Sequence, residues 1–599
     1  MKTRNVLRWL AMTLGMMSAS QGHSQPKSDP ARAPDLVVLN AAVVTEDAQR
    51  PSAQALAVSG DHFVYVGADA GARALVGKGT RVIDLKGLSV LPGLIDTHIH
   101  PALGEWTWRR LCQVRGYTTS EDYATLAACA RKSKQDGWLV AFGWYSTDNP
   151  KLDEITLAKL DELVPDRKLV VIARDGHTLW LNSKALQAFN ITKDSVDPQG
   201  GKIGRDPKTG LPNGILYDLA ARPVWGALWR NSPYAVSSLA LYRHLMPYLN
   251  SLGVTSILDA LTADDMERAY HALDAQGGLT MHVSMAFRIN PDDYRTEIPR
   301  IASKRASQTA HTSVDYLKIF GDGNLEDGLA DMLQPYGLEQ PSFDGYFTQE
   351  QMNEIVHLAE RNRISIYVHC IGDRCTNKVL NAVALARKTS PCDWCRHTIT
   401  HLQWVAPSDV PRFKQLGVLA NIQEGWLAPR SFGGPPGYNY LLADAAVPQI
   451  GKAIAERMYP FRDLRDAGAH VAGGSDWFYT DENPWHNIES GATSKDPGEA
   501  SEEPMVPNQT LPVGFLLQAR TINAAYQLRA EHETGSIEVG KKADFIVVDR
   551  NILTEPVDRI HDTKVLMTFF EGREVRIASP ENVPQTSRVA SPPVFPLSH

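Results

Sequence analysis

Short apolar runs separated by Gly, Asn and Asp dominate both ends of the chain. At the beginning they cover 35–39, 54–58, 62–66 and 81–85, and near the end they cover 543–549 and 565–570. Runs of this length, rich in Val, Leu and Phe and bounded by turn-forming residues, are typical of β-strands. The pattern therefore predicts a composite β-sandwich domain formed by residues 35–90 and 530–578.

Between these ends, strand-like apolar runs alternate with helical stretches. The clearest runs are 254–258, 316–320, 364–368, 398–402, 418–422 and 470–474, and an amphipathic helix over 353–360 precedes one of them. Alternation over this length predicts a parallel sheet, and at this size an α/β (β/α)8 TIM barrel over 91–529. The gap between residue 100 and the strand near 254 predicts a large insertion after barrel strand 1, at about 105–245, which contains a strand at 169–173.

Length, composition and charge narrow the function. The chain has 599 residues, with 43% hydrophobic and 22% charged residues, which indicates a globular protein of more than one domain. The formal net charge is −7 without a dominant basic block, so nucleic acid is not expected as a partner. A small-molecule substrate is expected, and homodimer formation stays open.

The first residues resemble an export signal. Lys2, Arg4 and Arg8 precede an apolar stretch over 9–17, and small residues follow up to Gly22. The apolar stretch is too short for a transmembrane helix. We expect a signal peptide at 1–22, a linker at 23–34, a flexible tail at 579–599 and a periplasmic or secreted protein without a membrane partner after cleavage. An uncleaved anchor is the alternative.

Six cysteines are compatible with an oxidising compartment. Cys392 and Cys395 form a Cys-x-x-Cys pair, which is open to three interpretations: a local bridge, a redox pair or half of a zinc site. No second Cys-x-x-Cys completes a four-thiolate site, so a bridge or free thiols are favoured. The connectivity of the six cysteines cannot be read from their spacing.

Candidate metal ligands follow the apolar runs. His98 and His100 end the first barrel strand, and because side chains alternate along a strand the two imidazoles point to the same side. Lys318, His369, His401 and Asp476 each follow a later run and precede a turn or polar stretch. Catalytic groups of TIM barrels gather at these carboxyl ends of strands. His397, on the same strand as His401 but deeper, is expected to be a core histidine.

Several segments together resemble the amidohydrolase superfamily, in particular its branch of YtcJ-like proteins and N-substituted formamide deformylases. The segments that carry the resemblance are 91–100, 174–186, 317–323, 368–374, 400–403, 474–477 and 540–549. It extends from about residue 35 to 575. The resemblance implies a barrel with a composite β-sandwich and a divalent metal, zinc by ligand type, with one or two ions per chain. The implied ligands are His98, His100, Lys318, His369, His401 and Asp476, with Lys318 as a candidate for N-carboxylation.

The resemblance also implies a reaction. Metal-activated water attacks a carbonyl, and Asp476 serves as general base and then acid while a C–N bond of an amide or N-substituted formamide breaks. His177 is the implied substrate or oxyanion contact, and Trp180 of the tryptophan-rich insertion is a second candidate for substrate binding. The alternatives are an esterase, lactonase or carbamate hydrolase on the same fold, and a non-catalytic binding protein that retains the barrel.

One position departs from the family pattern. Glu424 stands where a proline is common after the glutamine of the strand that follows His401. We expect this position to lie near the barrel mouth, where it would alter the range of substrates.

Overall fold

A computed structural model describes most of the chain, namely residues 33–114, 119–133, 137–144, 156–173, 176–198, 200–231, 236–325, 328–336, 343–389, 391–429 and 450–575. The expected signal peptide, nearly all of the linker and the expected tail lie outside these ranges. Within them, every helix is too short or too polar to cross a membrane.

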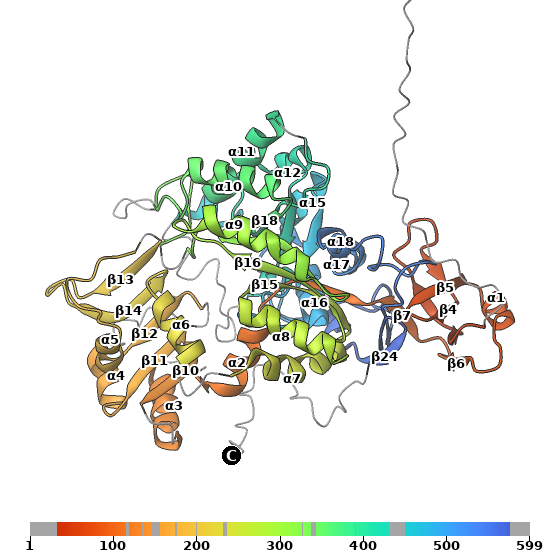
Figure 1. Cartoon of the computed structure of the whole chain (residues 1–599), viewed down its shortest axis with the longest axis horizontal. Coiled ribbons are helices and arrows are strands. Elements are labelled where there is room, and N and C mark those ends of the chain that lie inside the picture. Colours follow the sequence, from red (N-terminus) through yellow and green to blue (C-terminus); the bar gives the residue numbers. More distant parts are fainter. Residues whose placement is uncertain are drawn as a thin grey trace, which may run out of the picture.

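Eight parallel strands form the central sheet, which curls until its last strand approaches its first (Figure 1). In order they are β8 (Leu94–Ile99), β15 (Val254–Thr262), β16 (His282–Arg288), β17 (Thr312–Phe320), β18 (Ser365–Cys370), β19 (Thr398–His401), β20 (Leu419–Ile422) and β21 (Val471–Gly473). The predicted TIM barrel is thereby confirmed. Strand β16 is an addition that the runs did not reveal.

Helices cover the outside of this barrel. Those between and after the strands include α7 (Ser238–Ser251), α8 (Asp264–Ala275), α9 (Tyr294–Ser303), α10 (Gln349–Arg361), α11 (Asp373–Thr389), α16 (Pro484–Thr493), α17 (Val513–Ala519) and α18 (Ile522–Gln527). Helix α10 begins with a capping box between Thr348 and Gln351 and buries Met352, Ile355 and Val356. Its apolar stripe explains why the sequence already indicated it.

The insertion between β8 and β15 has a sheet of its own, on one side of the barrel (Figure 1). Its strand order is β13-β14-β12-β11-β10-β9. The strands are β9 (Cys112–Gln113), β10 (Trp138–Trp144), β11 (Lys168–Ala173), β12 (Thr178–Leu181), β13 (Gly201–Arg205) and β14 (Pro212–Asp218), with α2 (Pro101–Arg110), α3 (Thr119–Lys132), α4 (Leu157–Leu163), α5 (Ser183–Ala188) and α6 (Arg222–Asn231) around them. The segment thus supplies its own hydrophobic core, as a long insertion requires.

Two further sheets lie on the opposite side of the barrel (Figure 1). One has the order β5-β4-β1-β6, from β1 (Leu36–Leu39), β4 (Ala55–Ser59), β5 (His62–Gly67) and β6 (Arg81–Asp84). The other is β24-β23-β22-β7-β2-β3, from β2 (Ala42–Val44), β3 (Ser52–Ala53), β7 (Ser89–Pro92), β22 (Phe545–Val548), β23 (Val565–Phe570) and β24 (Arg573–Val575). Strands from both chain ends share this sheet, because β7 pairs antiparallel with β22.

The six cysteines form three disulfides, Cys112–Cys129, Cys370–Cys375 and Cys392–Cys395. The last one is the local bridge that the sequence favoured. The zinc interpretation of this Cys-x-x-Cys needs thiolates, which a bridged pair does not offer, whereas the bridge is compatible with a redox pair in its oxidised form.

A charged contact connects the amino-terminal end of barrel strand β17 to the sheet that both chain ends share. The imidazole of His311, just before β17, lies between Asp274 of α8 at 2.6 Å and Glu571 of the β23–β24 turn at 3.1 Å. The hydrogen bond with Glu571 raises the pKa of His311 to about 9, and Asp274 adds to this effect against partial burial. Burial raises the pKa of Glu571, but His311 and Lys542 outweigh it and lower this pKa to about 2.

Replacing His311 by Asn will therefore destabilise the protein in a pH-dependent way. Because its pKa is raised on folding, the protonated imidazole stabilises the native state below about pH 6.5, and this contribution disappears as the pH rises through about 9. We expect a loss of about 2 kcal/mol at pH 6 and much less at pH 10. Thermal unfolding of both proteins at the two pH values measures it, and an equal loss at both would contradict the assignment.

Candidate metal centre

Six predicted side chains converge at the carboxyl ends of the barrel strands. His98 and His100 come from the end of β8, Lys318 from β17, and His369 and His401 from β18 and β19. Asp476 follows β21 directly. All six are buried, although they bear charged or polar groups. The barrel topology brings together residues that are spread over nearly 380 positions of sequence.

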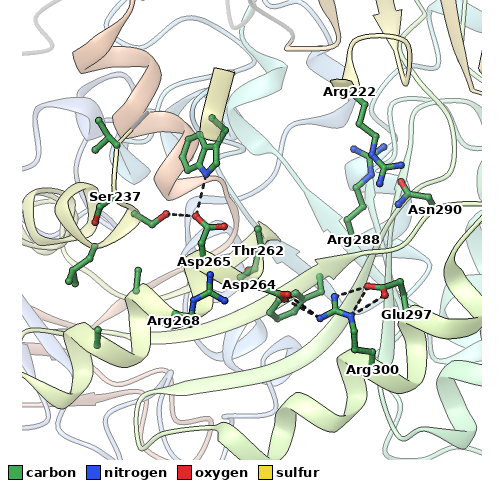
Figure 2. Close-up of a pocket in the computed structure, with 18 of the residues that line it drawn as sticks. Arg222, Ser237, Thr262, Asp264, Asp265, Arg268, Arg288, Asn290, Glu297 and Arg300 are labelled. Carbon is green, nitrogen blue, oxygen red and sulfur yellow. Dashed lines mark hydrogen bonds and ion pairs between the residues drawn. The ribbon is translucent and has the colours of Figure 1, made fainter. Parts of the chain in front are cut away.

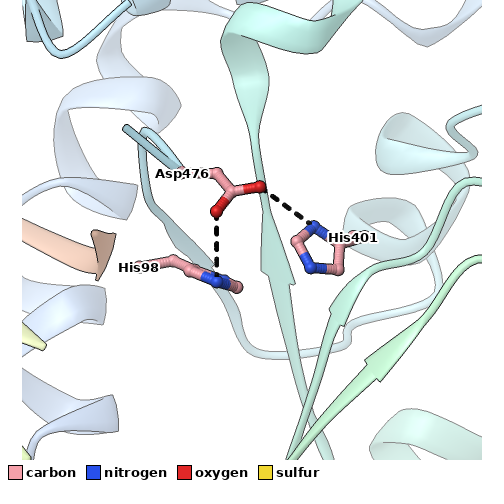
Figure 3. Close-up of side chains that lie close together, drawn as sticks. All are labelled: His98, His401 and Asp476. Atoms are coloured by element: carbon pink, nitrogen blue, oxygen red, sulfur yellow. Dashed lines mark ion pairs between the residues drawn. The ribbon is translucent and has the colours of Figure 1, made fainter. Parts of the chain in front are cut away.

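Asp476 lies between the histidines (Figure 3). Its Oδ1 is 3.4 Å from His98 Nε2 and 3.1 Å from His100 Nε2, and its Oδ2 is 3.9 Å from His401 Nδ1. The imidazole of His369 is close to the same group, because its ring centroid is 4.4 Å from that of His401. One carboxylate and four imidazoles therefore surround one small volume.

The donor set fits a divalent metal ion. His98 Nε2, His369 Nε2 and Asp476 Oδ1 are buried, and within the described parts of the chain none of them forms a well-aligned hydrogen bond, although Asp476 Oδ1 lies within ion-pair distance of both His98 and His100. Leaving such atoms without a partner costs about 1–3 kcal/mol each, so a metal that binds them removes a penalty that the fold otherwise bears. One ligand atom each from His98, His401 and Asp476 already lies within 4.8 Å of the others. Imidazole nitrogens with a carboxylate oxygen are typical zinc ligands.

The protonation states suit this role. Burial holds the pKa values of His98, His369 and His401 well below 6.5, and the Lys318 charge adds to the effect on each. Neutral imidazole is the form that binds metal, so these rings do not need to lose a proton first. Burial raises the pKa of Asp476, against the lowering effect of His100.

Lys318 is buried in surroundings that favour the neutral form of its amine. Its Nζ is buried, 4.7 Å from the ring centroid of Phe320 and 5.5 Å from that of Tyr367. Burial lowers its pKa to about 7 despite the attraction of Asp476. A substantial fraction is thus the neutral amine near neutral pH, and only that form can add CO2 to become an anionic ligand.

Hydrogen bonds to the Nδ1 atoms of two histidines orient these ligands. His98 Nδ1 lies 2.8 Å from Thr400 Oγ1 and 2.9 Å from the Tyr367 hydroxyl. His401 Nδ1 lies 2.8 Å from Gln423 Oε1, so it donates to this amide oxygen. Partners of this kind fix the tautomer and leave the other nitrogen for a metal. No motif in the sequence assigns this role to Thr400, Tyr367 or Gln423, although Thr400 and Gln423 stand in segments already singled out.

The backbone is unusual at two of the ligands. His401 has φ +75° and Asp476 has φ +56°, in the left-handed region that side chains with a Cβ rarely adopt. Such conformations cost about 1–3 kcal/mol each and persist where surrounding contacts impose them. At Asp476 the contact is clear, because its backbone N–H donates to the His98 carbonyl oxygen at 2.7 Å.

The insertion reaches the centre through His177. This residue immediately precedes β12, and its ring centroid is 5.6 Å from that of His369. Its Nδ1 is hydrogen-bonded to Asp218 Oδ1 at 2.6 Å. Asp218, at the end of β14, belongs to no motif and was missed by the sequence analysis. The two residues place a polar group of the insertion directly above the barrel ligands.

Trp180 does not reach the centre, contrary to the prediction that it contacts substrate. It lies on the opposite face of β12 from Leu179, in a separate core of the insertion, with its ring centroid 5.8 Å from that of Trp144. Successive residues of a strand point to opposite faces. Because Leu179 packs in the core that the insertion shares with the barrel, the side chain of Trp180 points away from the barrel.

Glu424 is also displaced from the expected position at the barrel mouth. It is fully buried and forms an ion pair with Arg520. Arg520 Nη1 is in turn 3.3 Å from Asp96 Oδ2, and Asp96 Oδ1 accepts the backbone N–H groups of Ser475 and His98 at 3.0 and 3.1 Å. The residue that replaces the family's proline therefore supports the ligand loops from within the barrel.

A parallel eight-stranded barrel with histidines and an aspartate at its strand ends defines a class of hydrolases built around a metal centre. The chain belongs to the amidohydrolase family, whose sequence model matches residues 81–576. This confirms the resemblance from its motifs. The chain is 24% identical to N-substituted formamide deformylase from Arthrobacter pascens over 554 residues, which covers 90% of this chain and 97% of that protein.

Two further comparisons extend over similar lengths. Protein LONG AFTER FAR-RED 3 from Arabidopsis thaliana is 26% identical over 567 residues, covering 90% of this chain and 91% of that protein. The crystal structure of an uncharacterized metal-dependent hydrolase from Pyrococcus horikoshii OT3 superposes with a TM-score of 0.67 at 20% identity, covering 87% of this chain and 99% of that one. The latter likeness establishes the fold.

Replacing His98 by Ala will abolish stoichiometric metal binding. We expect the purified wild-type protein, after exchange into metal-free buffer, to retain one or two divalent ions per chain and the variant to retain almost none. His98 provides a buried ring nitrogen, Nε2, that forms no well-aligned hydrogen bond and is free to bind a metal. Plasma mass spectrometry measures the content. His357→Ala, an exposed histidine of α10, is the matched control, and equal content in all three proteins would contradict the site.

Proposed function

We propose that the protein is an exported metal-dependent hydrolase that cleaves the C–N bond of an amide or N-substituted formamide. The observation that carries the proposal is the buried group of His98 Nε2, His369 Nε2 and Asp476 Oδ1 at the strand ends, none of which forms a well-aligned hydrogen bond with the described residues. Membership of the amidohydrolase family and the length of the match to a formamide deformylase support the choice of bond.

The ligand set has a defined chemical purpose. A divalent metal, zinc by ligand type, held as one or two ions by His98, His100, Lys318, His369, His401 and Asp476, would supply a water of lowered pKa and polarise the substrate carbonyl. N-carboxylation would make Lys318 an anionic ligand. The low pKa of the Lys318 amine supports this modification.

Two residues of the chain have separate roles in the proposed reaction: Asp476 transfers the proton, and His177 stabilises the developing negative charge. Asp476 accepts a proton from the attacking water and returns it to the amine nitrogen while the C–N bond breaks, because it is the carboxylate that lies among the ligand imidazoles. His177 donates a hydrogen bond to the carbonyl oxygen as negative charge develops there. Asp218 holds the His177 ring in place through Nδ1.

Export rests on two features. The first residues have the charge and hydropathy pattern of a signal peptide. In addition, all six cysteines are paired, which suits a periplasmic or extracellular compartment.

Replacing Asp476 by Asn will abolish turnover and leave metal bound. The amide keeps an oxygen ligand but cannot take a proton, so we expect kcat on an N-substituted formamide to fall by about 10³-fold or more. Release of formate and amine measures the rate, and Asp558→Asn, an exposed aspartate, is the control. A variant that keeps its metal and its full rate would refute the proton transfer. Turnover of matched esters but not of formamides by the wild type would refute the choice of bond.

Replacing His177 by Ala will lower kcat by about 10²-fold without loss of metal, because it removes one donor to the developing oxyanion. A role in substrate binding alone would instead raise KM and leave kcat unchanged. Steady-state kinetics with metal analysis of the same samples separates the two, and unchanged values of both constants would exclude His177 from the reaction.

A further inference from the structure

A cavity of about 1010 Å³ lies between the insertion and the barrel (Figure 2). Residues of α6 and of the start of α7 form one wall. The other wall comes from the segments that follow β15 and β16 at the carboxyl ends of the barrel strands. The site residues described above do not line it, so it is a separate feature.

Most acidic groups of this cavity are already engaged within the protein. Asp264 and Glu297 both pair with Arg300. Asp265 accepts hydrogen bonds from Ser238 Oγ and Trp229 Nε1 at 2.9 and 3.3 Å.

Two arginines of the cavity, unlike its acidic groups, have no polar partner among the described residues. Arg288, at the end of β16, and Arg222, at the start of α6, make no side-chain hydrogen bond and no ion pair within the described ranges, and Arg288 Nε is wholly buried. Figure 2 shows their guanidinium groups meeting, with Asn290 beside them. Burial and the Arg222 charge lower the pKa of Arg288 to about 10, which still leaves it a cation at neutral pH.

A guanidinium group that is largely buried without a counterion is unfavourable, and this applies to Arg288, whereas Arg222 beside it is exposed and adds a second positive charge. Asp218 and Asp293 exert some attraction on Arg288, but neither forms an ion pair with it. The free protein therefore keeps a position for one negative charge that its own side chains do not fill.

This position is close to the reacting centre. The guanidinium carbon of Arg288 lies 4.6 Å from the ring centroid of Phe320. The same ring is 4.7 Å from Lys318 Nζ, and its centroid is 5.4 Å from that of His369 and 6.0 Å from that of His177. Arg288 and Lys318 are also register neighbours on β16 and β17. One molecule can therefore contact Arg288 while its carbonyl group lies at the metal centre.

We propose that Arg288 and Arg222 bind a carboxylate of the substrate, so that the preferred substrates are amides that also carry a carboxylate, such as N-formyl or N-acyl amino acids. The inference rests on the proposed function for the bond that is cleaved. Arginine forks match a planar carboxylate with two parallel hydrogen bonds. A phosphate dianion suits the site less, because Asp218 and Asp293 would repel its second charge.

Binding tests the arginine pair without turnover. Phenylacetate and its neutral isostere phenylacetamide are titrated calorimetrically into the metal-loaded protein, where we expect the carboxylate to bind at least about 10-fold more tightly. Arg288→Gln should weaken the binding of phenylacetate by about 10- to 100-fold and leave the binding of phenylacetamide unchanged.

Arg268→Gln is the charge-matched control, an exposed arginine at the other end of the cavity (Figure 2). Equal binding of phenylacetate by the wild type and Arg288→Gln overturns the proposal. The proposal is also overturned if phenylacetate binding depends on the metal and not on Arg288.

Turnover tests the substrate class. N-formylphenylalanine and N-formylphenethylamine differ by one carboxylate, and we expect the wild type to prefer the former in kcat/KM. Arg288→Gln should raise KM for N-formylphenylalanine by about 10- to 100-fold and leave its neutral counterpart unaffected. A preference for the neutral compound that the variant preserves overturns the proposal. If neither is hydrolysed by metal-loaded protein, the proposed C–N chemistry fails for this class, and the calorimetric result still decides whether the arginines bind a carboxylate.

Discussion

The closure of the barrel between its first and last strands is the contact on which the metal centre depends. The backbone N–H of Asp476 donates to the His98 carbonyl oxygen at 2.7 Å, and Thr97 Oγ1 donates to the Gly473 carbonyl oxygen at 2.8 Å. The approach leaves no room for a side chain at Gly474, where a Cβ would lie 2.6 Å from the His98 backbone nitrogen. The same contacts that close the sheet therefore set the distance between the histidine pair and the aspartate.

A buried set of charges holds this closure in register. Asp96 accepts backbone N–H groups from both sides of the seam, and Arg520 connects it to Glu424. Burying these charges offsets much of their attraction, so the arrangement adds little net stability. Its effect is on geometry, since loss of any one member would leave the others charged and unpaired in the interior.

Local patterns were sufficient for the features that each strand carries by itself. His98, Lys318, His369 and Asp476 could be predicted because each ends an apolar run, and the ends of parallel strands meet at one rim. The pattern was insufficient where a role arises between distant segments. Asp218 belongs to no motif, and only the fold brings it to His177. Strand β16 was missed because His282 and Ser284 interrupt its apolar residues. Trp180 was misplaced because composition does not say which face of a strand is turned to the barrel.

The arrangement separates the chemistry of the site from its selectivity. Barrel strands and the residues just after them provide every proposed metal ligand, and their positions are fixed by hydrogen bonds between neighbouring strands and by the contact of Asp476 with His98. The insertion provides His177 and Arg222, which approach the same rim from outside the barrel. Changes in the insertion can therefore alter which molecule is held, while the distances among the ligands remain those that the barrel imposes. Arg288 lies at the boundary, since it extends from a barrel strand into the cavity that the insertion covers. Its charge, which no described side chain pairs, thus lies where the barrel meets the insertion.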